Sequence, residues 1–140
     1  EINLDAQKWD LPRDRSKNKA SQIVHLSDRV LDELNALVGP AQHALVFTTT
    51  GTTPVCGFSK AKAKLDQISG VSNWRLHDLR RSLATVATEE LGFEPVVVDR
   101  ILNHVNGSVK GIAAVYQKGQ YLEKRKTVLD VWAEYIQTPT

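Results

Sequence analysis

Apolar residues recur at the spacing of an α-helix in four separate stretches of this chain, at residues 28–38, 76–91, 95–104 and 121–136. Within each stretch they fall three or four positions apart and form one stripe, which has to pack against another element. A fifth stretch, 58–69, also favours a helix, and Gly70 ends it. The chain is therefore restricted to folds with a mainly helical core.

Three of these stripes make specific predictions about burial. The helix that starts at about residue 76 should bury Leu76, Leu79, Leu83, Val86 and Ala87. The helix that starts at Pro95 pairs Val97 with Ile101 and Val98 with Leu102, and the last helix aligns a larger apolar set: Val128, Leu129, Trp132, Tyr135 and Ile136.

The N-terminal part of the chain has a different pattern. Ile2 and Leu4, and then Trp9 and Leu11, alternate with polar residues, and residues 22–27 resume an apolar run after a polar, basic loop. These features predict a β-hairpin, and residues 43–57 predict a further short strand and a loop. The expected fold class is α+β, mainly α-helical with a small N-terminal antiparallel sheet.

Composition narrows the functional classes. The 140 residues correspond to one domain, and a single cysteine excludes an internal disulfide and a thiolate metal cluster. No apolar run is long enough to span a bilayer. The net charge of +2 is small, but lysines and arginines cluster at 13–19, 60–64 and 118–126, which permits a polyanionic partner such as DNA.

His77 and Arg80 open the third helix, in the sequence "LHDLRRSLAT". Three residues correspond to about 60° around a helix, so both side chains can converge on one object. Taken singly, each has an ordinary structural explanation, such as a helix cap for His77 or an ion pair with Asp78, Glu89 or Glu90 for Arg80. His104 and Tyr116 also have structural explanations when taken alone, and Lys17 by itself would be a solvated surface residue.

The order of four motifs changes this interpretation. "SKNK", "LHDLRRSLAT", "ILNHVNGS" and "AVYQK" follow one another in this chain. Together they resemble the catalytic domain of the tyrosine recombinases, the phage-integrase family, over nearly the whole sequence. The resemblance implies that family's catalytic-domain fold and a catalytic set that comprises Lys17, His77, Arg80, His104 and Tyr116. Lys19 is an alternative to Lys17, and Tyr121 is an alternative to Tyr116.

The sequence departs from the family pattern in two places. Asn103 stands where the family usually has glycine, at a turn position that should be strained for another residue. The family's first catalytic arginine belongs upstream of the strands that begin this sequence. We therefore expect residues 1–140 to be most of a catalytic domain truncated at its N-terminus, without the arginine-bearing helix and the separate N-terminal DNA-binding domain, and inactive alone.

The resemblance implies site-specific DNA integration or recombination, in which DNA strands are cut and rejoined through a 3′-phosphotyrosine intermediate. No metal or other cofactor is expected. Double-stranded DNA would be the partner, with Lys19, Lys60 and Arg81 as phosphate contacts. Self-association on DNA through the last helix and a cytoplasmic, nucleoid-associated location are also expected. The alternatives are a non-catalytic DNA-binding or adaptor module, a type IB topoisomerase-like enzyme and, less favoured, a metal-dependent hydrolase that uses His77 and His104.

Overall fold

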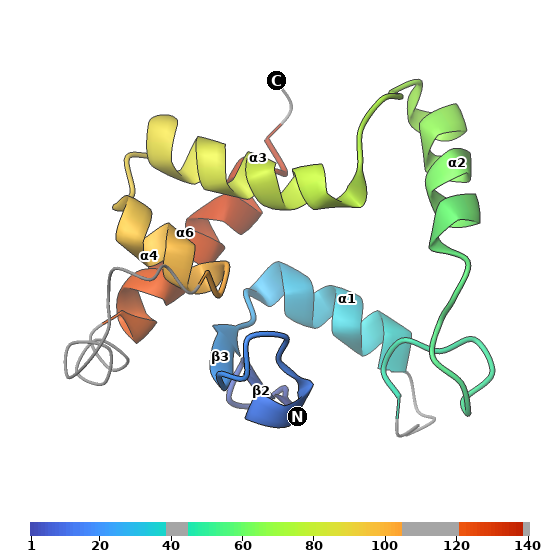
Figure 1. The fold of residues 1–140 in the computed structure, drawn as a ribbon, viewed down its shortest axis with the longest axis horizontal. Helices are drawn as coiled ribbons and strands as arrows, with labels where there is room; N and C mark the ends of the chain where they lie inside the picture. The colour runs from blue at the N-terminus through green and yellow to red at the C-terminus, as the bar shows by residue number, and fades with distance from the viewer. Residues whose placement is uncertain (39–44, 105–120, 139–140) are drawn as a thin grey trace.

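The computed structural model describes residues 1–38, 45–104 and 121–138 (Figure 1). Its elements are, in chain order, β1 (Ile2–Asn3), β2 (Lys8–Leu11), the short 3-10 helix η1 (Arg13–Arg15), β3 (Gln22–His25), α1 (Asp28–Val38), α2 (Phe58–Ser69), α3 (Leu76–Glu89), α4 (Pro95–Ile101) and α6 (Leu122–Tyr135). A mixed fold with a small antiparallel sheet was predicted, and the described residues confirm it.

The sheet has the order β1-β2-β3, and both pairs are antiparallel. Trp9 lies opposite Ile2 on one side and Val24 on the other, as expected for alternating, half-buried strands. The predicted hairpin is thus confirmed, with β2 and β3 as its strands. Residues 12–21 connect them, and we call this connection the hairpin loop.

The main apolar core lies between α3, α4 and α6, which cross one another in Figure 1. Its fully buried members are Ala87 of α3, Val97 and Val98 of α4, Leu102 just after α4, and Val128 of α6. Leu83 and Ile101 are partly buried against them. The predicted pairing of Val97 with Ile101 and of Val98 with Leu102 therefore identifies the inward face of α4 correctly.

The burial predicted for the first turns of α3 was wrong. Leu76 is 49% exposed and Leu79 is 60% exposed, whereas Ala87 is completely buried. The reason is the length of α3: its C-terminal half packs on α4 and α6, and its N-terminal half continues past them toward α2 (Figure 1). A stripe on a helix shows which face is apolar, but it does not show where the packing partner stops.

The segment before α3 is sparsely packed. None of the residues of α2 is buried, and its Phe58 and Ile68 are 60% and 73% exposed. Lys62 lies over the ring of Trp74 at 4.8 Å, so one contact ties α2 to the connection that leads to α3. Upstream of α2, residues 45–57 contain an isolated bridge between Thr48 and Pro54 instead of the predicted strand.

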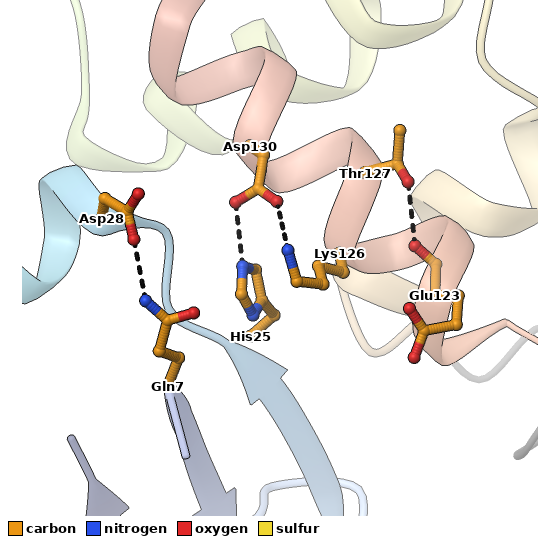
Figure 2. Close-up of polar contacts among 7 residues, drawn as sticks. All are labelled: Gln7, His25, Asp28, Glu123, Lys126, Thr127 and Asp130. Atoms are coloured by element: carbon orange, nitrogen blue, oxygen red, sulfur yellow. Dashed lines mark hydrogen bonds and ion pairs between the residues drawn. The ribbon is translucent and has the colours of Figure 1, made fainter. Parts of the chain in front are cut away.

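Polar contacts attach α6 to the sheet (Figure 2). The Asp130 carboxylate accepts hydrogen bonds from His25 Nε2 at 2.8 Å and from Lys126 Nζ at 2.9 Å. Burial alone would raise the pKa of Asp130, but the bonds from Lys126 and His25 outweigh it and hold the pKa below its usual value. Arg125 of α6 also donates to the carbonyl of Ile23 in β3.

Candidate functional site

Two hydrogen bonds between Arg75 and Asp78 fix the first turn of α3. The Arg75 N–H donates to the Asp78 carboxylate at 2.8 Å, and the Asp78 N–H donates back to the Arg75 carbonyl at 2.8 Å. The bond from the Arg75 N–H is the main cause of a lowered pKa at Asp78. An acidic residue in this position satisfies a free N–H and favours a helix start. This arrangement fixes the helical backbone from which the side chains of His77 and Arg80 extend.

The end of α4 is where separate parts of the chain meet. Three successive carbonyl groups follow the last helical bonds, and a side chain from a different segment binds each one. Gln22 of β3 donates to Ile101 at 2.8 Å, Arg80 of α3 donates to Leu102, and Asn18 of the hairpin loop donates to Asn103 at 2.9 Å. We call residues 101–104 the α4 terminal turn. The C-terminal end of a helix carries partial negative charge, so the guanidinium of Arg80 is also favoured there electrostatically.

Asn103 adopts the left-handed conformation that the sequence indicated. Its φ is +52°, in the region that glycine occupies most easily and asparagine tolerates. The Asn103 side chain donates to Ser16 Oγ at 3.3 Å and to Asn18 Oδ1 at 3.4 Å. These bonds, together with the bond from Asn18 to the Asn103 carbonyl, hold the turn in a conformation that is unfavourable for an isolated residue.

The α4 terminal turn brings together three parts of the predicted catalytic set. Arg80 binds its main chain, His104 is its last residue, and Lys17 and Lys19 flank the Asn18 that binds it. His104 Nδ1 lies 3.1 Å from a carboxylate oxygen of Asp99. Both lysines are exposed. A guanidinium has five N–H donors, so the bond from Arg80 to Leu102 leaves donors for a second acceptor such as a phosphate oxygen.

Other predicted residues lie outside this cluster of contacts. His77 is exposed on the first turn of α3, and its side chain makes no hydrogen bond or ion pair with any residue that the structure describes. Arg81 is paired with Asp78 at 3.2 Å and its side chain is 73% exposed. Lys60 is exposed on α2, apart from the α4 terminal turn (Figure 1). Tyr116 lies outside the described residues.

Tyr121 and Ile136 concern two other predictions, the alternative nucleophile and self-association through the last helix. Tyr121, the alternative nucleophile, is packed against the core cluster. Ile136, just after α6, is 57% exposed, whereas Val128 and Ala133 of α6 are buried within the chain. Self-association through this helix therefore stays a prediction.

Sequence reasoning did not identify Asn18 and Gln22 as part of the site. They lie about 80 positions from the carbonyls that they bind, and no local pattern reports a contact over such a separation. The one available signal was Asn103, a non-glycine residue at a position where glycine was expected.

Within residues 1–38, 45–104 and 121–138, no group of three or more histidine, cysteine, aspartate or glutamate side chains is placed to hold a metal ion. No helix in the same described ranges has the length and apolar character needed to cross a membrane.

The chain is similar to a known protein, the prophage integrase IntA of Escherichia coli K12. The two are 27% identical over 139 residues, which is 97% of this chain and 33% of that protein. The chain thus spans about a third of the length of this curated relative. No family model and no solved structure matches the chain. The similarity extends over nearly every residue, and it supports a relationship to the integrases.

Proposed function

We propose that the intact protein is a site-specific tyrosine recombinase that integrates or recombines DNA, with residues 1–140 forming most of its catalytic domain. The observation that carries the proposal is the meeting of Arg80, His104 and the lysine-bearing hairpin loop at the α4 terminal turn. The similarity to a prophage integrase supports the same function. The first catalytic arginine and a DNA-binding domain would come from other parts of the intact protein.

The chemistry requires a fixed cation at the reacting phosphate, because negative charge grows on its non-bridging oxygens in the transition state. Arg80 is suited to this role because its planar fork donates parallel hydrogen bonds and does not lose its charge. A well-placed donor of this kind contributes about 3–4 kcal/mol to the transition state. His104 and His77 would donate to the same phosphate or assist removal of the tyrosine proton.

Tyr116 is the proposed nucleophile. Its oxygen would attack phosphorus, the bond from phosphorus to the 5′ oxygen would break, and a lysine of the hairpin loop would protonate that leaving oxygen. The 3′-phosphotyrosine intermediate conserves the ester bond, so the 5′ hydroxyl of a second strand can reverse the step. The double-stranded DNA would be held by lysines and arginines, with Lys19, Lys60 and Arg81 as candidate phosphate contacts.

The proposal is tested by trapping the covalent intermediate. The intact protein should form a covalent adduct with a nicked DNA substrate from which the cleaved end diffuses away. Tyr116→Phe should abolish the adduct and leave DNA affinity within about threefold, because the substitution removes one oxygen and no charge. Denaturing gel electrophoresis measures the adduct, and a filter-binding assay measures affinity.

Tyr121→Phe is the matched control, since it removes the same atom from the alternative nucleophile. It should retain the adduct. An adduct that survives in Tyr116→Phe and disappears in Tyr121→Phe would move the nucleophile to Tyr121. Loss of DNA cleavage on addition of a chelator would contradict the metal-independent mechanism.

A non-catalytic DNA-binding module is the second candidate. It is favoured by the bond from Arg80 to the Leu102 carbonyl, because closing the end of α4 is by itself a sufficient structural reason for an arginine in that position. Such a protein would bind the same DNA and form no covalent adduct with the nicked substrate.

A further inference from the structure

The hairpin loop and the α4 terminal turn are joined by reciprocal bonds between two asparagines. Asn18 Nδ2 donates to the Asn103 carbonyl at 2.9 Å, and Asn103 Nδ2 lies 3.4 Å from Asn18 Oδ1. Ser16 is buried, with 4% of its surface exposed, and its hydroxyl donates to Asn18 Oδ1 at 2.6 Å. The same oxygen accepts the Ala20 N–H at 3.1 Å. Asn18 is therefore oriented from within its own loop before it reaches across to the turn.

These bonds fix the backbone from which the side chains of the two loop lysines extend. Lys17 and Lys19 are the two neighbours of Asn18, and the Lys19 N–H closes a tight turn on the Ser16 carbonyl at 3.1 Å. Lys19 has a φ of +55°, so the backbone on that side of Asn18 is also held in a left-handed conformation. On the other side of the contact, the residue after Asn103 is His104, and the residue before it accepts the bond from Arg80.

We propose that Asn18 and Asn103 are positioning residues that hold the catalytic lysine of the hairpin loop against the phosphate site formed by Arg80 and His104. This inference rests on the proposed function and adds to it a pair that does not touch the DNA. It also explains why asparagine occupies position 103: glycine would satisfy the φ but would supply no donor to the loop.

The step that depends on this positioning is departure of the 5′ oxygen. The Tyr116 hydroxyl oxygen forms a bond to phosphorus and gives its proton to the imidazole of His77 or His104. The bond from phosphorus to the 5′ oxygen breaks with its electron pair on that oxygen. The lysine ammonium gives that oxygen a proton and is left neutral. If sulfur replaces the bridging 5′ oxygen, the leaving group needs no proton, because the pKa of a thiol is only about 8.5.

The experiment compares Asn103→Gly with the unmodified intact protein on two DNA substrates, one with the bridging 5′ oxygen and one with 5′ sulfur. Glycine keeps the φ of +52° without strain and removes only the side-chain donor. Single-turnover cleavage of the oxygen substrate should fall by about 10-fold to 100-fold, the range expected for a catalytic group displaced by up to 1 Å. Cleavage of the sulfur substrate should stay within about twofold of the unmodified protein. Asn18→Ala should give the same pattern.

Tyr135→Phe is the control for the loss of a hydrogen bond elsewhere. The Tyr135 hydroxyl donates to Glu90 at 2.7 Å, between α6 and the end of α3, so its removal should leave both cleavage rates unchanged. Thermal unfolding of all three variants shows whether each remains folded.

Each outcome has a distinct meaning. Equal loss on both substrates would show that the asparagine pair supports another step or the fold as a whole, and it would overturn the positioning role. Unchanged cleavage of both substrates would overturn it as well. If the unmodified protein forms no covalent adduct with either substrate, the proposed function is wrong and the positioning role is wrong with it.

Discussion

Arg80 is the residue on which structural and catalytic explanations compete. Its guanidinium donates to the Leu102 carbonyl, and this bond would exist whether or not the protein cleaves DNA. Lysine can keep a positive charge near the same carbonyl, but it has no planar fork with which to hold a carbonyl and a phosphate together. The two explanations therefore predict different consequences for one substitution.

We expect Arg80→Lys to reduce formation of the covalent adduct by about 100-fold to 1,000-fold, the effect of losing one transition-state donor. DNA affinity should change by less than about threefold, because the charge is kept. Single-turnover cleavage and filter binding measure the two quantities. Arg81→Lys is the matched control, since Arg81 is the adjacent arginine, is largely exposed and is paired only with Asp78 among the described residues. Equal adduct yields in the two variants would leave Arg80 with a structural role only.

At the scale of elements, one carboxylate makes a polar contact between α6 and the sheet that changes with pH. Asp130 binds His25 of β3 and Lys126 of its own helix (Figure 2), and its pKa is held below the usual value. A lowered carboxyl pKa stabilises the folded state at pH values above the unfolded pKa of about 3.9. The stabilisation is lost as the pH falls through the lower, folded pKa.

We therefore expect Asp130→Asn to lower the free energy of unfolding by about 1 kcal/mol at pH 7, a modest value because the carboxylate is partly exposed. The fall in stability between about pH 5 and pH 2 should also become shallower in this variant. Urea unfolding at several pH values measures both effects. Glu33→Gln provides the control, because it removes an exposed pair with Arg29 on α1 that contributes only about 0.3–0.5 kcal/mol. An identical pH profile for Asp130→Asn and the unmodified protein would contradict the prediction.

The elements themselves were largely predictable from the sequence. Alternation predicted the hairpin, and helical spacing with Gly70 at the boundary predicted α2 at its observed limits. Pro95 marked the start of α4 correctly, but α4 ends at Ile101, before the predicted end at about His104. Leu76 and Leu79 were placed wrongly because a local pattern contains no information about how far a neighbouring helix extends. The bond from Asn18 to Asn103 was not predictable for a related reason, since it depends on the packing of two segments that are 85 positions apart.

At the scale of the whole molecule, the distribution of charge matters more than the net charge of +2. Lys19 lies on the hairpin loop beside the sheet and Lys60 lies on α2, and these two segments lie apart in Figure 1. Both are exposed, and both are proposed to contact phosphates. If one duplex reaches both positions, each lysine displaces about one counterion from the DNA.

Lys19→Gln and Lys60→Gln should each reduce the slope of log affinity against log salt concentration by about 0.9, and the double variant should reduce it by about 1.8. Affinity for unrelated DNA sequences should fall by the same factor, since phosphate contacts do not read bases. Fluorescence anisotropy over a range of salt concentrations measures the slope. Lys124→Gln is the control, because Lys124 is already paired with Glu94 at 2.6 Å. A slope that Lys60→Gln leaves unchanged would place α2 outside the DNA contact.

The sparse packing of α2 has a consequence for how the chain opens. A helix of 12 residues is marginally stable in water by itself, and no residue of α2 is buried. Its backbone amides consequently gain little protection from the core formed by α3, α4 and α6, and local opening of α2 requires only a small part of the free energy of global unfolding. A protease should therefore reach the peptide bonds of α2 while the rest of the described chain stays folded.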